Sequence, residues 1–288
     1  MNKKYKCKKK IKEPEGKEKY SETSLNMLTC NAAGLKTKTQ SLKSVIIFFK
    51  SSVFSVQETH FSKKGKFKHD NFVIFEAIRK KEGGGSLLGI HVALKPVLIS
   101  EYSDSIELLI VEIKAENKRI RVMTGYGPQE TWDIDIKMKF FNTLEAEIVK
   151  ASYSGTSLIL MGDLNSKLGP EFIKNDPHSI TENGKILAGI MERNALTVVN
   201  GLEQVCRGLI TRERTTVDSV EKSIINFVIV SQDIVQNISS IMIDDERRYV
   251  LTKLSKTKKG VIKTESDNNI IVTELKIEWK PHSKSHTN

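Results

Sequence analysis

Apolar and polar residues alternate in short blocks along this chain from Leu25 onward. Stretches such as KRIRVMTGY (118–126) and VTELKIEW (272–279) alternate with a period of two, which is typical of a strand with one buried face. Other short apolar runs are bounded by turn-forming residues, as strands commonly are. These patterns predict strands at residues 25–31, 53–58, 72–78, 86–94, 107–115, 119–126, 157–162, 196–200, 224–230, 239–244 and 270–278.

Three segments have helical spacing instead, with apolar residues three and four positions apart. Each stripe predicts a helix whose apolar face packs on the core, and a core role is favoured over a cofactor site. The stripes are Leu42, Val45, Ile46 and Phe49; Met138, Phe141, Leu144 and Ile148; and Ile186, Leu187 and Ile190. The glycine run EGGGS at residues 82–86 lies between two predicted strands and predicts a hairpin turn.

About eleven strands with helices between some of them predict an α/β fold in which two mixed β-sheets pack together and helices flank them. A chain of 288 residues with 39% hydrophobic residues fits one large domain. We expect a disordered basic leader at 1–24, a single domain at 25–280 and a disordered tail at 281–288. No apolar run approaches the roughly 18 residues of a membrane-spanning helix, and the N-terminus lacks the apolar centre of a secretory signal.

The net charge of +11 is concentrated in two places. Residues 1–20 contain nine Lys and three Glu, and residues 251–264 contain five Lys and no acidic residue. A lysine-rich leader is typical of a nuclear-localisation or nucleic-acid-binding arm and equally of a solvated tail, so both readings stay open. Lysine with few aromatics nearby favours contact with phosphates over the readout of bases. Three scattered cysteines fit neither a disulfide framework nor a zinc site, which favours a nuclear or cytoplasmic location.

Polar residues suited to binding metal ions or phosphate follow several of the predicted strands. Asp and Asn after a strand are most often turn residues, but strand ends also converge at one edge of an α/β fold. Mg²⁺ prefers a few carboxylate and amide oxygens and keeps positions for water and phosphate. The candidates are Asn31 in LTCNAAG, Glu58 in FSVQETH, Tyr126 in TGYGPQE, Asp163 and Asn165 in LILMGDLN, and Asp267, Asn268 and Asn269 in SDNN.

The ordered motifs CNAAGL, VQETH, GYGPQE, MGDLNSKLG, KSIINFVIVS and ESDNNIIV resemble those of the endonuclease/exonuclease/phosphatase family, whose fold is that of DNase I. GGGSLLGI, NGLEQVCRGLITRERTT and DDERRYVLTKLSK look more narrowly like endonuclease domains of non-LTR (LINE-type) retrotransposons and like retroelement-derived proteins similar to craniofacial development protein 2. The resemblance covers about residues 25–279. It implies a four-layer α/β sandwich and a Mg²⁺- or Mn²⁺-dependent phosphodiesterase that nicks DNA, with no small-molecule cofactor and no membrane partner.

Matching the motifs residue by residue implies roles around the metal. Glu58 would be the principal metal ligand, with Asn31 beside it. Asp267 would support the metal site. Asp163 would orient or deprotonate the attacking water, which suits a reaction that needs a base as well as charge neutralisation.

Two positions of the family pattern are substituted in this chain. The family's last motif reads Ser-Asp-His, and its histidine is held by the Asp of a Ser-x-Ile/Leu-Asp-Tyr/Phe motif. Asn268 and Asn226 stand at these two positions here. An amide cannot carry a proton or a positive charge, so we expect cutting to be impaired more than metal or DNA binding, with the two amides able to pair. Asn165 and Tyr126 would still hydrogen-bond the scissile phosphate.

Basic residues near the motifs are candidates for contact with the phosphates of DNA or RNA. They are Arg207, Arg212 and Arg214 in CRGLITRERTT and Lys253, Lys256, Lys258 and Lys259 before the last motif. His60, His91 and His178 match no motif, so a surface or packing role is favoured for each. The leading hypothesis is an impaired retroelement-type endonuclease. The alternatives are a catalytically inactive nucleic-acid-binding protein of the same fold and a phosphoesterase for inositol phosphates or lipids.

Overall fold

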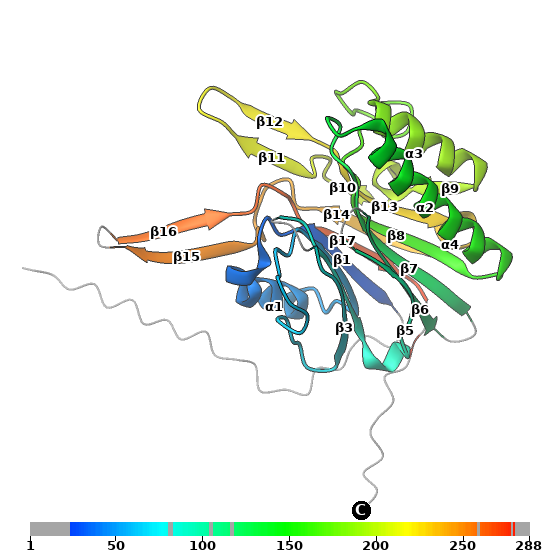
Figure 1. Cartoon of the computed structure of the whole chain (residues 1–288), viewed down its shortest axis with the longest axis horizontal. Helices are drawn as coiled ribbons and strands as arrows, with labels where there is room; N and C mark the ends of the chain where they lie inside the picture. The colour runs from blue at the N-terminus through cyan, green and yellow to red at the C-terminus, as the bar shows by residue number, and fades with distance from the viewer. Residues whose placement is uncertain are drawn as a thin grey trace, which may run out of the picture.

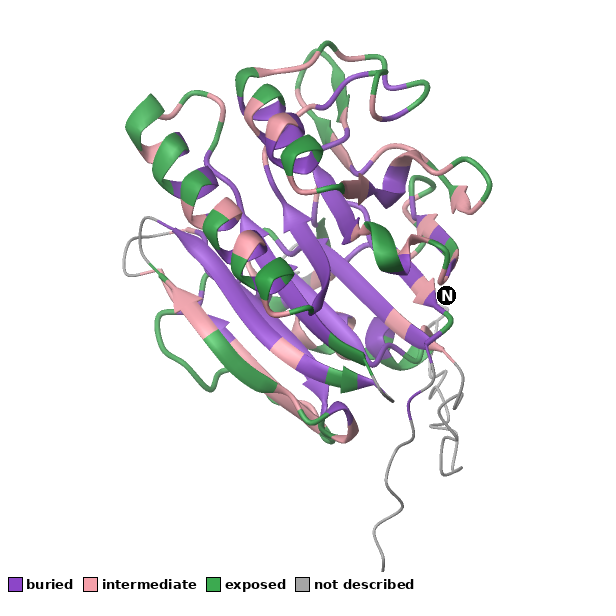
Figure 2. Cartoon of the chain, turned by 90° about the vertical axis from the view of Figure 1, so that its right-hand side faces the viewer, coloured by how far each residue is buried: buried purple, intermediate pink, exposed green. Residues whose placement is uncertain are grey.

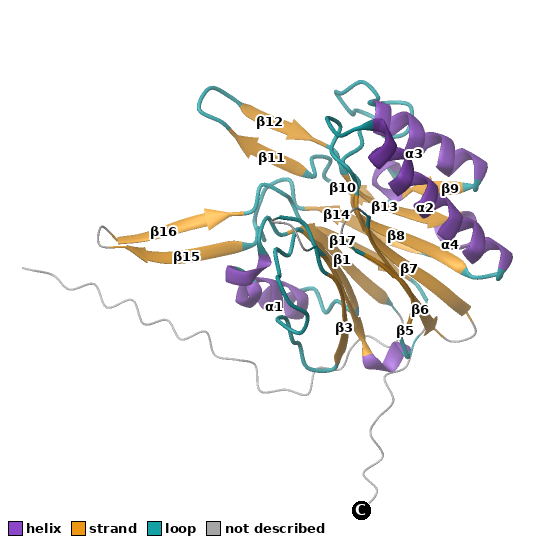
Figure 3. Cartoon of the chain, viewed as in Figure 1, coloured by secondary structure: helices purple, strands orange, loops and turns teal. Residues whose placement is uncertain are grey.

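Two large β-sheets occupy the centre of the molecule, and helices lie against their outer faces (Figures 1 and 3). The computed structural model describes residues 24–79, 83–103, 106–115, 118–257, 260–277 and 279. Of the predicted leader only Ser24 is included, and the predicted tail lies outside the described residues.

The first sheet carries the beginning and the end of the folded chain. Its strands are β1 (Leu25–Asn31), β2 (Val53–Gln57), β3 (Phe72–Ala77), β4 (Ser86–His91), β10 (Cys206–Arg207), β14 (Ile238–Ile243) and β17 (Ile271–Leu275). Their order across the sheet is β10-β14-β17-β1-β2-β4-β3. β1 is parallel to β2 and antiparallel to β17, so β1 and β2 end at the sheet edge where β17 begins.

The second sheet carries the middle of the chain. Its strands are β5 (Val97–Tyr102), β6 (Glu107–Ala115), β7 (Lys118–Tyr126), β8 (Ser157–Asp163), β9 (Leu196–Val198) and β13 (Asn226–Ser231), in the order β5-β6-β7-β8-β13-β9. β7 and β8 are parallel and pair Tyr126 with Asp163 at their last residues. β13 runs antiparallel to β8, so its first residue, Asn226, lies opposite Asp163.

Helices and two hairpins complete the fold. The helices are α1 (Thr39–Phe48), α2 (Ile134–Tyr153), α3 (Glu182–Arg193) and the short α4 (Gln232–Val235), with 3-10 turns η1 (Leu35–Thr37), η2 (Val92–Leu94) and η3 (Val199–Gly201). β11 (Arg212–Thr215) pairs with β12 (Val220–Ser223), and β15 (Thr252–Thr257) pairs with β16 (Gly260–Glu265). Both hairpins project from the body of the molecule on the same side (Figure 1).

Three apolar clusters separate four layers. One lies between the sheets and joins Leu25 and Val53 to Val111 and Ile159. A second lies between the β5–β9 sheet and helices α2 and α3, and a third lies between the β1–β2 sheet and α1. The central strands β1, β2, β4, β7, β8 and β13 are accordingly buried along most of their length (Figure 2). This arrangement confirms the predicted four-layer α/β sandwich.

The predicted elements agree with the structure wherever hydrophobic alternation was strong. All eleven predicted strands are present, with ends that differ by a few residues, and among the described residues six further strands were missed: β5, β10, β11, β12, β15 and β16. β3 and β4 are antiparallel neighbours, as the predicted EGGGS hairpin requires; Gly83 to Gly85 lie between them, and Glu82 is outside the described residues. The core role predicted for Met138 is wrong, because this side chain is 38% exposed, and Phe140 occupies the buried face of α2 instead. Within the described residues, no helix is both long and apolar enough to cross a membrane.

Candidate active site

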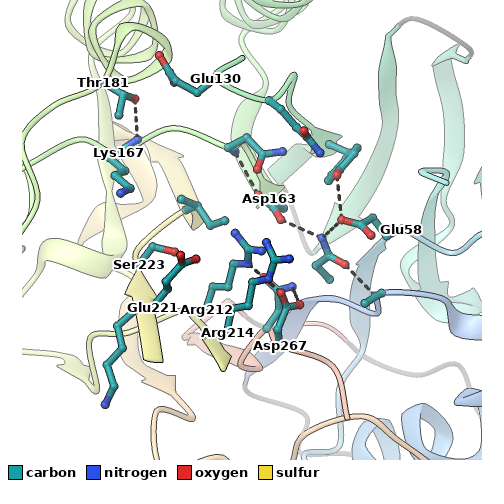
Figure 4. Close-up of a pocket in the computed structure, with 18 of the residues that line it drawn as sticks. Glu58, Glu130, Asp163, Lys167, Thr181, Arg212, Arg214, Glu221, Ser223 and Asp267 are labelled. Atoms are coloured by element: carbon teal, nitrogen blue, oxygen red, sulfur yellow. Dashed lines mark hydrogen bonds and ion pairs between the residues drawn. The ribbon is translucent and has the colours of Figure 1, made fainter. Parts of the chain in front are cut away.

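Strand ends from both sheets meet at a cleft of about 1010 Å³ (Figure 4). Asn31 ends β1 and Glu58 directly follows β2 in the first sheet, while Tyr126 ends β7 and Asp163 ends β8 in the second. Because each pair of strands is parallel, each sheet delivers both of its side chains to the same edge. All four residues line the cleft. The convergence expected from the sequence is therefore present.

Asn31 joins the two acidic residues at the centre of the cleft. Its Nδ2 donates to Oε1 of Glu58 at 2.7 Å and to Oδ2 of Asp163 at 2.9 Å. Its Oδ1 accepts a hydrogen bond from the backbone N–H of Ala33 at 2.9 Å, which fixes the orientation of the amide. A single buried side chain thus ties both acids to the end of β1.

The turn after β2 holds Glu58 in a backbone conformation that side chains rarely adopt. Glu58 has φ 50° and His60 has φ 53°, both in the left-handed region. The carbonyl oxygen of Glu58 accepts from Gly34 N, and His60 N donates to the carbonyl oxygen of Gly84, each at 2.9 Å. Backbone strain of this kind costs about 1–3 kcal/mol per residue and persists only where neighbouring structure fixes it, commonly at functional sites.

Glu58 is held as a carboxylate. Burial acts to raise its pKa, but hydrogen bonds from His60, Asn31 and Tyr126 outweigh burial and leave the pKa below its ordinary value. The hydroxyl of Tyr126 donates to Oε1 at 2.8 Å, and Nε2 of His60 lies 3.4 Å from Oε2. Burial, followed by the negative charges of Glu58 and Asp163, raises the pKa of Tyr126, so this phenol stays neutral and remains a donor.

Asp163 is poised to exchange a proton near neutral pH. Burial raises its pKa to about 7, although hydrogen bonds from Asn31 and from the backbone N–H of Asn165 act in the opposite direction. Asn165 also has a left-handed φ of 46°, and its Nδ2 donates to the carbonyl oxygen of Gly127 at 2.9 Å. The turn after β8 therefore fixes both polar side chains of its motif.

Asp267 and Asn268, in the segment before β17, also line the cleft. Oδ2 of Asp267 accepts from Nε of Arg212 at 3.0 Å, and its Oδ1 accepts from Nδ2 of Asn268 at 2.8 Å. The hydroxyl of Ser266 donates to the carbonyl oxygen of Asn31 at 2.7 Å. This bond connects the last motif of the chain directly to the first.

Asn226 and Asn268 pair with each other, amide to amide. Nδ2 of Asn226 donates to Oδ1 of Asn268 at 2.9 Å, and the two residues are only 0% and 3% exposed. Oδ1 of Asn226 is buried and has no hydrogen-bond partner among the described residues. The pair keeps the geometry of a hydrogen-bonded dyad but contains no group that titrates.

The donors on the cleft wall fit a hard divalent cation. Mg²⁺ commonly binds protein through one or two carboxylates and keeps several waters. Glu58 is ionised and faces the amide nitrogen of Asn31, whose oxygen accepts from Ala33 N. Both oxygens of Asp267 also accept hydrogen bonds. In the part of the chain that the structure describes, no three His, Cys, Asp or Glu side chains form a closed metal cage. A site with few protein ligands centred on Glu58 is what this donor set suits.

The predicted basic residues are divided between the cleft and other places. Arg212 and Arg214 line the cleft, whereas Arg207 lies in β10 and does not. Lys253 and Lys256 lie in strand β15 of the projecting hairpin. The predicted residues Lys258 and Lys259 fall outside the described residues.

Several cleft residues were missed by the sequence reading. His178 lines the cleft, and His60, the last residue of VQETH, contacts Glu58, although the sequence reading favoured a surface or packing role for both. The cleft is also lined by Gln129, Glu130, Thr181, Lys167 and Lys222. His91 is buried, in keeping with a packing role. Gln129, Glu130, Lys167 and Lys222 lie inside the quoted motifs but were given no role there, whereas His178 and Thr181 lie in a loop that no motif marks.

Comparisons with known proteins identify the fold. No family model matches the sequence, and no curated protein matches it. Among solved structures, the AP endonuclease LMAP from Leishmania major is 11% identical, with a TM-score of 0.69 over 88% of each chain. A 3′-5′ exonuclease (NExo) from Neisseria meningitidis is 13% identical, with a TM-score of 0.65 over 87% of this chain and 99% of that one.

A retrotransposon protein has the same fold. The endonuclease domain of TRAS1, a telomere-specific non-LTR retrotransposon, is 14% identical, with a TM-score of 0.58 over 90% of this chain and 100% of that domain. At such identities the likeness defines a fold and not an activity. The chain has the DNase I-like fold that its motifs predicted.

Proposed function

We propose that this protein is a divalent-metal-dependent DNA endonuclease of retrotransposon origin whose cutting step is impaired. The observation that carries the proposal is the hydrogen-bonded group Glu58–Asn31–Asp163, which faces Arg212 across the cleft. This group combines an ionised carboxylate, a fixed amide and an acid that exchanges a proton near pH 7. Solved proteins of the same fold include endonucleases and an exonuclease, which supports a nuclease.

Each residue has a part in phosphodiester hydrolysis. Glu58 and Asn31 would hold Mg²⁺ or Mn²⁺, which neutralises charge on the scissile phosphate. Asp163 orients the attacking water and accepts its proton. The side-chain amide of Asn165 has two N–H groups, of which one donates to the carbonyl oxygen of Gly127. The other would donate to an oxygen of the scissile phosphate. Tyr126 donates its only O–H to Glu58 and therefore orients that carboxylate.

Asn226 and Asn268 make the cutting step slow. In the resembling family an Asp–His pair stands here, and an imidazolium beside the phosphate stabilises charge and moves a proton. Loss of a positioned proton-transfer group costs about 10²–10⁴-fold in rate. The cleft would keep its affinity for metal, since the side chains of Glu58 and Asn31 bond to each other, to Tyr126 and to Asp163 and not to the dyad. It would keep its affinity for nucleic acid as long as Asp267 still holds Arg212. The lysine-rich residues 1–20 support a nuclear location, with a cytoplasmic one as the alternative.

A catalytically inactive nucleic-acid-binding protein is the second candidate. The observation that favours it is the amide pair itself, which is buried, hydrogen-bonded and without a titrating group. Such a protein binds DNA or RNA through phosphates, with strong salt dependence and no nicking.

Nicking of supercoiled plasmid in the presence of Mg²⁺ separates the two candidates. The chain is compared with the double variant Asn226→Asp/Asn268→His and with that variant carrying Glu58→Ala as well. We expect the double variant to nick about 10²–10⁴-fold faster than the unmodified chain, and Glu58→Ala to abolish its nicking. Equal rates for the unmodified chain and the double variant would show that the dyad argument is wrong. If neither nicks while both bind plasmid, the binding protein is the correct description.

A further inference from the structure

The loop between β2 and β3 carries an unassigned cluster of positive charge. Residues 61–71, FSKKGKFKHDN, form what we call the lysine loop. Its four lysines, Lys63, Lys64, Lys66 and Lys68, occupy four of six consecutive positions, and all are exposed. The sequence reading overlooked this cluster, because acidic residues elsewhere leave the body of the chain close to neutral.

The lysine loop is fixed to the body of the protein at several points. Phe61 and Phe67 are 5% and 2% exposed and belong to the apolar cluster beneath α1. The ring of Phe67 packs edge-on against that of Phe54 at 5.8 Å. Between the two anchors, the buried carboxylate of Glu76 accepts a hydrogen bond from Gly65 N. A loop held in this way presents its lysines without the backbone entropy loss that a disordered lysine tail would suffer on binding.

The anchors also determine what the loop can recognise. Both of its phenylalanines are buried, so its exposed groups are mainly ammonium groups on flexible stems. Lysine acts as a point charge toward phosphate, and no exposed aromatic side chain of the loop is available to stack on a base. Lys64 is paired with Glu101 at 2.6 Å, but an exposed pair of this kind contributes little and can exchange for a phosphate. The chemistry fits a polyanionic backbone read without sequence preference.

The lysine loop starts beside the cleft. It begins directly after His60, which contacts Glu58. In Figure 4, Glu58 lies on one side of Asp163, and Arg212, Arg214 and Ser223 of the β11–β12 hairpin lie on the other. The lysine loop therefore leaves the site from the side opposite the hairpin. Positive charge is available on both sides of the acidic centre.

We propose that the lysine loop holds the phosphate backbone of double-stranded DNA on the Glu58 side of the cleft, so that the duplex spans from this loop to the β11–β12 hairpin. This inference rests on the proposed function, in that it takes the occupant of the cleft to be DNA. The lysine loop is then a further surface for contact with DNA, separate from the arginines of the cleft and from the β15–β16 hairpin.

The test is the salt dependence of binding to a fluorescein-labelled duplex of random sequence. Affinity is measured by anisotropy between about 50 and 300 mM KCl for the full chain and for a variant with Lys→Gln at the four loop positions. A matched control removes four exposed lysines at the far ends of the sheets: Lys95, Lys114, Lys118 and Lys276. Both variants lose four positive charges, so only the place of the charge differs. Circular dichroism verifies that each is folded.

Each phosphate contact contributes about 0.9 to the slope of log affinity against log salt concentration. We expect the loop variant to lose about 2–4 from the slope and the control variant to lose less than about 0.5. Equal slopes for the loop variant and the unmodified chain would overturn the inference while leaving DNA binding by the cleft intact. Equal losses in both variants would overturn it too, because the effect would then be one of net charge. Failure of the unmodified chain to bind duplex would overturn the inference and the proposed function together.

Discussion

The Asn226–Asn268 pair can be tested without any measurement of activity. If these two buried side chains form a pair, the effects of replacing them on the free energy of unfolding should not add. Asn226→Asp turns the donor of the 2.9 Å hydrogen bond into an acceptor that faces Oδ1 of Asn268. Asn268→His instead places a ring nitrogen opposite Nδ2 of Asn226, from which a neutral imidazole accepts the hydrogen bond.

The magnitudes follow from burial. Asn226 is 0% exposed, so the single Asp variant loses one hydrogen bond and buries a carboxyl group opposite a carbonyl oxygen. We expect a loss of about 2–4 kcal/mol in the free energy of unfolding. Asn268→His should cost about 1 kcal/mol, because it loses the bond to Asp267 while the ring keeps the bond from Asn226. The double variant pairs carboxylate with imidazole and should recover about 1–3 kcal/mol relative to the sum of the single changes.

Urea unfolding followed by circular dichroism measures all four proteins of this cycle. The midpoint and slope of each curve give the free energy of unfolding, and equal slopes confirm that the same transition is compared. Effects of the single changes that simply add, within about 0.5 kcal/mol, would refute the pairing. The nicking assay would then have to be interpreted without a dyad.

Two further predictions concern stability. Burial raises the pKa of Glu107, which accepts hydrogen bonds from Gly85 N and Arg79, from 4.5 to about 7. Because the folded state then holds a proton that the unfolded state releases, the free energy of unfolding should fall between about pH 4.5 and 7 and level off above pH 7. Glu107→Gln should remove about 1–3 kcal/mol of this fall, as measured by urea unfolding at each pH. A pH profile that is unchanged in the variant would contradict the assignment. Gly208→Ala should destabilise the protein by at least about 2 kcal/mol more than Gly65→Ala in thermal unfolding. Both glycines have similar positive φ (84° and 75°), but a Cβ at Gly208 would lie 2.2 Å from the carbonyl oxygen of Ile243 while that at Gly65 meets open space, so equal losses would rule out crowding.

The sequence by itself determined the fold class, the main strands and the acidic centre. Strands buried on at least one face must repeat apolar residues at a fixed period, and that signal is local. The six missed strands lack it: β11, β12, β15 and β16 form exposed polar hairpins, β10 has two residues, and β5 is an edge strand with Val97 and Leu98 exposed. The group Asn31, Glu58 and Asp163 was found because each residue ends or follows a strand within a motif that resembles a known family.

Only the tertiary structure decided how these residues act on one another. Asn31 and Asp163 are 132 positions apart, and Ser266 is 235 positions from the carbonyl group that it holds, so no local pattern connects them. The anchoring of the lysine loop by Phe61 and Phe67 also arises only when distant elements pack. Hydrogen bonds and charges act over a few ångströms in space, whereas the sequence orders residues along the chain. The chain therefore specifies which groups are present, and the packing of its two sheets decides which of them meet.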